Sequence, residues 1–200
     1  MNKTFKITLT ALMAALCYVA FTFLQIKIQT PVGATSFHLG NVFCVLAALM
    51  IDGVSGGIAG AIGMGIGDLL DPFYVVTAPK TILLKFFIGF ITGSVAHKVL
   101  HIRQKSGKEL FICTLMAVCS GMLFNLVGEP IVSYLYYEVI LSNSDKALSY
   151  LNITKWITTS VNSLLTIVLA TPMYLAISSR IKINKWEDQQ KNIQKINIFY

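Results

Sequence analysis

The sequence feature that most restricts the fold is a glycine-rich apolar run between Phe37 and Pro72. Seven of the fourteen glycines of the chain fall between Gly53 and Gly67, and several lie four residues apart. In water each glycine in a helix costs about 1 kcal/mol relative to alanine, so a glycine-rich loop is the alternative. In lipid the backbone must satisfy its own hydrogen bonds, and small residues at this spacing form a flat face for close helix packing. Because Ile, Ala, Met and Leu interleave the glycines, we predict a membrane helix.

The composition extends this interpretation to the whole chain of 200 residues. The chain is 55% hydrophobic and only 12% charged, whereas an average soluble domain is about 25% charged. Apolar windows long enough to cross about 30 Å of hydrocarbon recur along the sequence. The first, near residues 7–24, lacks the cleavage context of a signal peptide, so we interpret it as a retained helix. We therefore predict a single integral membrane domain over residues 1–200.

The apolar windows predict an all-α bundle of six transmembrane helices. A polar external loop is expected over residues 25–36. Pro130 should kink the fifth helix near its outer end, because it removes one backbone donor. The expected helices cover residues 4–24, 38–51, 55–70, 80–100, 110–137 and 154–179, followed by a polar tail at 180–200.

The net charge of +7 indicates topology and not nucleic-acid binding. Eleven of the sixteen Lys and Arg residues lie before the first helix, around the connection between the fourth and fifth, or after the last. With six helices these segments fall on one side of the membrane, which the positive-inside rule assigns to the cytoplasm. Both termini are therefore predicted to be cytoplasmic.

The sequence contains no pattern that indicates catalysis or a bound cofactor. There is no phosphate-binding G-x-x-x-x-G-K motif and no pairing of a nucleophile with a base. The cysteines lack metal-type spacing and lie in apolar runs, where they behave as small hydrophobic residues: Cys17, Cys44, Cys113 and Cys119. We therefore expect no enzyme activity in this chain, no cofactor and no metal site.

Polar side chains inside the expected helices predict a substrate pocket, because such residues are expensive in a membrane. Asn125 and Glu129 are four residues apart on one helix face, and Lys85 and Glu129 both fall in the outer half of the membrane. A structural ion pair between Lys85 and Glu129 is the alternative, whereas Lys80 and Lys155 are expected to snorkel at helix ends. External-loop residues, with Asp68, Phe73 and Tyr134 nearby, complete an outward-facing pocket whose predicted members are Lys85, Asn125, Glu129, Asn162, His38, Asn41, Asp71 and Tyr74.

Several motifs occur in an order that is typical of one transporter family. They are Ala11-x-x-x-Ala15, the opening Phe37-His-Leu-Gly-Asn41, the glycine-rich helix ending Gly67-Asp-Leu-Leu-Asp71, and Ala78-Pro79 before Lys85. In these motifs, in its size and in its six expected helices, the chain over residues 4–181 resembles the substrate-binding (S) components of energy-coupling factor (ECF) transporters, the vitamin importers of prokaryotes. Asn41 stands where relatives with this opening often have Asp.

The resemblance implies a division of labour and a set of partners. The first three helices would dock on a transmembrane coupling subunit, with Ala11 and Ala15 at the contact. The last three helices and the external loops would hold a vitamin or a vitamin precursor. Two ATPase subunits would drive the S component to topple in the cell membrane of a prokaryote.

The identity of the ligand stays open at this point. Lys85 with Lys80 nearby suits a carboxylate- or phosphate-bearing ligand, while Glu129 and Asn125 suit a ring nitrogen or an amine. Pantothenate, a folate-like pterin and a hydroxymethylpyrimidine-type thiamin precursor are all compatible with these residues. A second class of function is a structural or assembly protein whose glycine-rich helix recruits a partner. A third, an integral-membrane enzyme, lacks a catalytic constellation.

Overall fold

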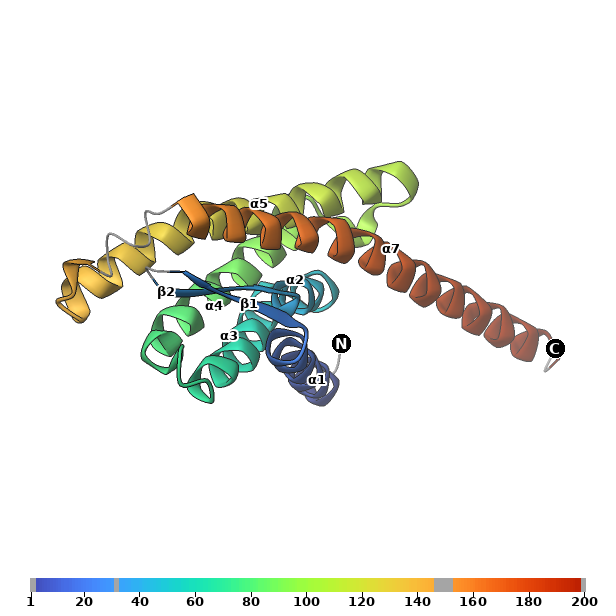
Figure 1. Ribbon diagram of the computed structural model, residues 1–200. Coiled ribbons are helices and arrows are strands. Elements are labelled where there is room, and N and C mark those ends of the chain that lie inside the picture. The colour runs from blue at the N-terminus through green and yellow to red at the C-terminus, as the bar shows by residue number, and fades with distance from the viewer. Residues whose placement is uncertain (1–2, 31–32, 146–152, 199–200) are drawn as a thin grey trace.

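The computed structural model describes residues 3–30, 33–145 and 153–198, and these residues form a mainly helical bundle with one small hairpin (Figure 1). Part of the external loop expected at 138–153 lies outside the described residues. Short 3₁₀ and π-helical segments, labelled η, interrupt or extend the helices. The elements in chain order are α1 (Lys3–Thr22), β1 (Gln25–Thr30), β2 (Gly33–His38), α2 (Gly40–Met50), α3 (Gly53–Leu69), η1 (Val75–Thr77), α4 (Ala78–Ser94), η2 (Val95–Val99), η3 (Ile102–Gln104), α5 (Gly107–Leu135), η4 (Tyr136–Ile140) and α7 (Ile153–Ile198).

Helices long and apolar enough to cross a membrane dominate the bundle. Within the described ranges there are four such segments: Lys3–Thr22, Val75–Val99, Gly107–Ile140 and Lys155–Arg180. Between the first two of them lie the shorter helices α2, with 11 residues, and α3, with 17. The chain is thus a helical membrane protein, in agreement with the class expected from its composition.

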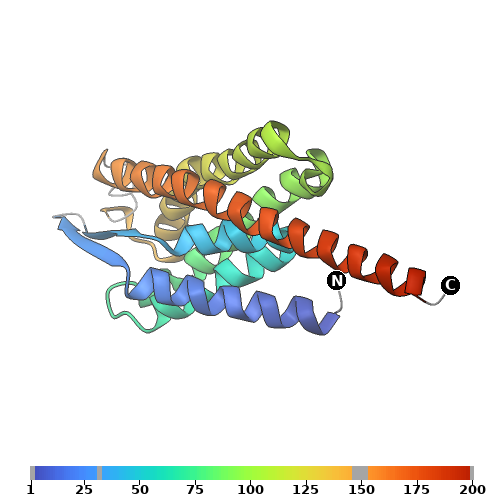
Figure 2. The same ribbon diagram turned by 90° about the vertical axis from the view of Figure 1, so that its right-hand side faces the viewer.

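The segment expected to be a polar external loop forms a β-hairpin instead. β1 and β2 pair antiparallel, with Gln25 opposite His38, and α2 begins only at Gly40. The connection expected as a polar loop over residues 25–36 is therefore a regular hairpin, which was not predicted. Figure 2 shows the hairpin at the end of the bundle opposite to the N-terminus.

The glycine-rich helix α3 packs against α1, α2 and α4. A Cβ atom at Gly56 would overlap Ala48 of α2, and one at Gly63 would overlap the carbonyl oxygen of Ala14 in α1. The glycines therefore allow the chain's own helices to approach closely, as small residues do in membranes. The opposite side of α3 is an exposed apolar stripe made of Val54, Ile58, Ile62, Ile66 and Leu69.

The two long C-terminal helices differ from the expectation at their ends. α5 continues through Pro130 up to Leu135, so the proline lies inside the helix and does not end it. α7 continues to Ile198, so the expected polar tail is helical. In both views the C-terminal part of α7 extends beyond the bundle on the side of the N-terminus (Figures 1 and 2).

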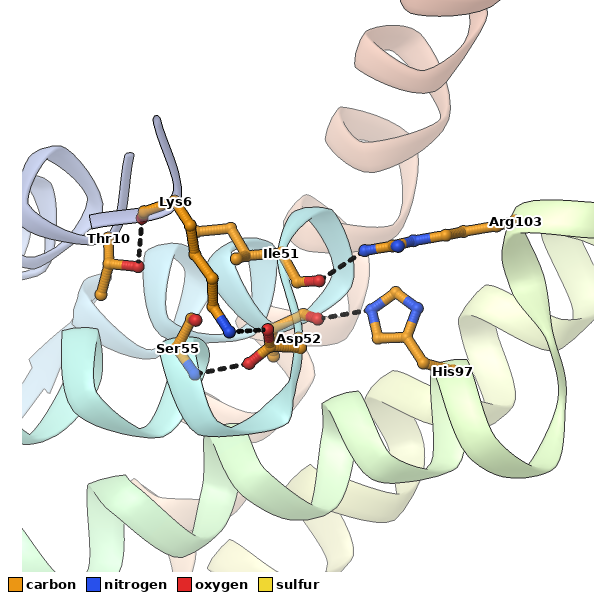
Figure 3. Close-up of polar contacts among 8 residues, drawn as sticks. Lys6, Thr10, Ile51, Asp52, Ser55, His97 and Arg103 are labelled. Carbon is orange, nitrogen blue, oxygen red and sulfur yellow. Dashed lines mark hydrogen bonds and ion pairs between the residues drawn. The ribbon is translucent and has the colours of Figure 1, made fainter. Parts of the chain in front are cut away.

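Asp52 joins α1 to the start of α3 at the end of the bundle that holds the N-terminus. Its carboxylate accepts a hydrogen bond from the backbone N–H of Ser55 at 2.9 Å and so caps the first turn of α3. The ammonium group of Lys6 in α1 lies 2.5 Å from the other carboxylate oxygen. Figure 3 shows both contacts.

The C-terminal end of α2 is held by two side chains from the segment between α4 and α5. Nε2 of His97 lies 2.9 Å from the carbonyl oxygen of Ala48. The guanidinium group of Arg103 donates to the carbonyl oxygen of Ile51 at 2.5 Å (Figure 3). Because the last carbonyls of a helix have no partner within it, these contacts fix α2 to the connection between α4 and α5.

Candidate functional site

A polar cavity lies at the end of the bundle that carries the hairpin. Asp52 and its contacts lie at the other end, near the N-terminus. The volume of the cavity is about 110 Å³. Side chains from α1, β2, α2, α3, α4, α5 and α7 surround it, so residues far apart in the sequence meet there. Seven of the eight residues predicted to bind substrate line this cavity: His38, Asn41, Tyr74, Lys85, Asn125, Glu129 and Asn162.

Asp71, the eighth predicted residue, lies outside this cavity. It borders a separate open hollow together with Phe73. There its carboxylate forms an ion pair with Lys27 of the hairpin and accepts a hydrogen bond from the backbone N–H of Phe73 at 3.0 Å. The structure therefore places Asp71 at the rim, where it ties β1 to the connection after α3.

Lys80 and Glu129 form the ion pair of the cavity. Nζ of Lys80 lies 2.6 Å from Oε1 of Glu129 and 2.8 Å from Oγ of Ser133. Lys80 is only 5% exposed, so the expectation that it snorkels to the membrane surface was wrong. A helix end placed between α3 and α5 has no free route to water, and the carboxylate replaces the water that a snorkelling lysine would reach.

Lys85 is the second buried lysine of α4, and it is 6% exposed. Glu129 pairs with Lys80, so the alternative of a Lys85–Glu129 ion pair is not what the structure shows. Within the described part of the chain, no hydrogen bond or ion pair involves the ammonium group of Lys85. A buried charge of this kind is costly unless a partner is provided. Lys85 therefore offers the cavity an ammonium group that is not held in a direct ion pair by the described residues.

Two asparagines add unsatisfied polar atoms beside Lys85. Asn41 is 1% exposed, and neither its amide nitrogen nor its amide oxygen has a hydrogen-bond partner among the described residues. Asn125 donates from its amide nitrogen to Oγ of Ser163 at 3.2 Å, but its oxygen is left without a partner there. A buried polar group without a partner costs about 1–3 kcal/mol. These atoms are therefore suited to a ligand with both donors and acceptors.

His38 shows the same combination of burial and a free polar atom. Its ring packs edge-on against Phe21 of α1, with 4.8 Å between the ring centres. Nδ1 of His38 is buried without a hydrogen-bond partner in the described part of the chain. The imidazole thus combines an apolar contact with one polar atom at the cavity wall.

Asn162 has a different role because both ends of its amide are occupied. Its oxygen accepts a hydrogen bond from the backbone N–H of His38 at 3.1 Å, and its nitrogen donates to the carbonyl oxygen of Ser36 at 3.0 Å. The side chain therefore pairs with the end of β2 that leads into α2, as a neighbouring strand would. We interpret Asn162 as the residue that positions the hairpin, and with it His38, over the cavity.

Several lining residues had no clear signal in the sequence. Lys155 was expected to snorkel but lines the cavity, and Asp68, which was placed only near the pocket, is buried in its wall. Threonine residues from four elements complete the lining, namely Thr35, Thr77, Thr81, Thr158 and Thr159. Threonine is common in membrane helices for packing reasons, so only the assembled fold separates these residues from others.

Ala11 and Ala15, predicted for partner docking, lie far from the cavity on the exposed side of α1. They are four residues apart and therefore share one face of the helix. Val19 continues this face one turn further, and it is 45% exposed. The structure thus leaves this face of α1 uncovered by the described parts of the chain.

The chain matches one family of known proteins over most of its length. Residues 1–179 match the family model described as ECF-type riboflavin transporter, S component. No curated protein sequence matches the chain. A solved structure described as "Structure and mechanism of the S component of a bacterial ECF transporter" matches with a TM-score of 0.56 and 16% identity, covering 90% of this chain and 99% of that chain. At this identity the structural likeness concerns the fold alone.

Proposed function

The chain belongs to the family of ECF-type riboflavin transporter S components, and we propose that it is the membrane-embedded, high-affinity solute-binding subunit of an ATP-driven ECF importer. Its solute would be a vitamin or a vitamin precursor. The observation that carries the proposal is the polar cavity inside an otherwise apolar helical bundle. In that cavity Asn41 and Asn125 present buried polar atoms that the described residues leave unsatisfied, and the buried Lys85 lines the same wall.

We place this cavity at the outer face of a prokaryotic cell membrane, with six helices spanning the bilayer. The support comes from the distribution of charge. The basic segments around Lys6, Arg103 and Arg180 lie at the other end of the bundle, and the positive-inside rule assigns that end to the cytoplasm. Solute would then enter beside the hairpin, and both termini would be cytoplasmic.

The chain would act by binding and not by catalysis, so the energy must come from partners. We propose a transmembrane coupling subunit and two ATPase subunits, with the exposed face of α1 around Ala11 and Ala15 as the docking surface. Small residues on an uncovered helix face allow close approach of a second helix in lipid. This docking would be separated from the cavity, so that ligand binding and coupling depend on different residues.

The alternative of an assembly protein that recruits a partner through its glycine-rich helix has less support. The glycines of α3 are covered by α1, α2 and α4. A partner could reach only the opposite, aliphatic side of that helix.

The test is ligand binding combined with co-purification. Purified protein in detergent is titrated with riboflavin, other B vitamins and their precursors, and unfolding is followed by thermal shift. A ligand at 100 times its Kd should stabilise the protein by about 2.7 kcal/mol. Native-membrane purification should recover a coupling subunit and ATPases with the tagged chain. If no vitamin or precursor binds and the chain purifies only with copies of itself, the proposal is wrong.

A further inference from the structure

The cavity carries more positive than negative charge. Its described lining contains three lysines, Lys80, Lys85 and Lys155, but only two carboxylates, Asp68 and Glu129. With the lysines and carboxylates ionised and the imidazole neutral, one positive charge remains in excess. In a buried setting such an excess is unfavourable, because charges removed from water need a compensating partner. A ligand with one negative charge would restore neutrality.

The hydrogen bonds show where the excess charge lies. Glu129 is already bound by Lys80 and by Ser133, whose Oγ lies 3.3 Å from the same carboxylate oxygen. Lys85 has no hydrogen bond or ion pair through its ammonium group in the described part of the chain. Lys85, which is 6% exposed, is therefore the lysine of α4 whose ammonium group is left for a ligand.

The polar atoms around Lys85 indicate how the rest of the ligand would be held. The amide of Asn41 supplies a free donor and a free acceptor, and Asn125 supplies a free acceptor. The cavity volume of about 110 Å³ is well below the roughly 300–1,000 Å³ that drug-sized ligands occupy. Both observations favour a compact molecule with an acidic group and a small polar edge.

We propose that the cavity selects a compact monocarboxylate, whose carboxylate group contacts Lys85 and whose remaining donors and acceptors are bound by Asn41 and Asn125. This inference rests on the proposed function, because it names the chemical class of the imported solute. It separates that solute from neutral vitamins of the same size, and from large neutral vitamins such as riboflavin.

The experiment compares acids with neutral partners of nearly equal shape. Calorimetry of the purified protein measures Kd for nicotinate against nicotinamide, pantothenate against panthenol, biotin against biotinamide, and lipoate against lipoamide, with riboflavin as the large neutral ligand. The expected result is that at least one acid binds, and that it binds at least tenfold more tightly than its neutral partner. Such a preference is a difference of affinities between molecules of nearly equal shape and therefore reports on the acidic group.

Two variants assign the preference to its residue. Lys85→Met should bring the Kd of the preferred acid close to that of its neutral partner, whereas Lys105→Met, which removes a lysine paired with Glu109 at the far end, should leave the preference unchanged. If Lys85→Met does not fold, the Kd values of the acids and of their neutral partners in the wild type still decide whether the cavity prefers a carboxylate.

The outcomes separate the inference from the proposed function. Equal or tighter binding of the neutral partner overturns the inference, as does binding of riboflavin alone, and both leave a vitamin-binding S component standing. Binding of none of the acids also overturns the inference. Failure of every vitamin and precursor overturns the proposed function as well.

Discussion

Lys80 of α4 and Glu129 of α5 form an ion pair with 2.6 Å between Nζ and Oε1. Ser133, one turn further along α5, contacts both partners. The ammonium group has little access to water, because Lys80 is almost fully buried. The pair therefore joins α4 to α5 beside the cavity, and it leaves Lys85 without a carboxylate partner.

The first prediction concerns the energetics of this pair. Lys80→Met leaves Glu129 without its cation, and Glu129→Gln leaves a buried ammonium group without its anion. Removal of one partner from a buried pair costs about 3–5 kcal/mol, and we expect the lower part of this range because 24% of the Glu129 side chain is exposed. The double variant should lose less stability than the sum of the single variants. Thermal unfolding in detergent measures the three values, and strictly additive losses would contradict the pairing.

The second prediction concerns the contact of Asn162 with the hairpin. Asn162→Ala removes both hydrogen bonds to β2, so hydrogen exchange of the backbone around His38 should become faster and the affinity for ligand should fall. The backbone N–H of His38 and the carbonyl oxygen of Ser36 would be left without these partners, and a buried polar group without a partner costs about 1–3 kcal/mol of stability. Ser160→Ala is the matched control, because that side chain is exposed and bonds only to its own turn of α7. Unchanged exchange at β2 in Asn162→Ala would show that the hairpin is held by other contacts.

The comparison with the sequence shows which features local pattern can predict. The motifs around Ala11, Phe37 and Gly67 indicated an S component, and the family match confirms it. The hairpin was missed although Ile26 and Ile28 alternate with polar residues, which is the pattern of a half-buried strand. Inside a chain dominated by membrane helices, such a short polar segment has the composition of a loop.

The partner of each buried charge could not be derived from the sequence. Lys80 and Lys85 lie on the same helix, five residues apart, and either could have reached Glu129 before the rotation of α4 against α5 was known. The choice depends on side-chain packing between helices, including Gly121 of α5, where a Cβ would overlap Thr92 of α4. Close approaches of this kind determine helix rotation, and local pattern does not encode them.

The third prediction separates docking from ligand binding. Ala11→Trp or Ala15→Trp places a large ring on the uncovered face of α1, so uptake into proteoliposomes that contain the complete transporter should be lost if this face meets the coupling subunit. The Kd for ligand should stay within about twofold of wild type, because distant sites are usually independent. Leu164→Trp, at another exposed apolar position, is the control and should transport normally. A loss of ligand binding in the alanine variants would instead assign them to internal packing.

The fourth prediction concerns Asp52, whose side chain both caps α3 and pairs with Lys6 (Figure 3). Asp52→Ala removes the cap and the pair and should cost about 1 kcal/mol, the usual value for an N-cap residue. Asp52→Asn keeps a good cap and loses only a half-exposed ion pair, which contributes about 0–1 kcal/mol. Lys6→Met should therefore resemble Asp52→Asn. Equal losses for the Ala and Asn variants would show that the cap contributes nothing.

The same residue gives the pH dependence a defined sign. Partial burial raises the pKa of Asp52, but the hydrogen bonds from Lys6 and from the Ser55 amide lower it by more, so the pKa lies below its ordinary value of 3.8. A carboxyl group whose pKa is lower in the folded state stabilises the protein above the unfolded-state pKa, and this stabilisation disappears as the pH falls through the folded-state pKa. The stability difference between wild type and Asp52→Asn should therefore be constant between about pH 5 and 8 and shrink in more acidic solution. The check is the free energy of unfolding of both proteins, measured from about pH 8 down into acidic solution. A stability difference that grows as the pH falls would mean that the ion pair with Lys6 does not form.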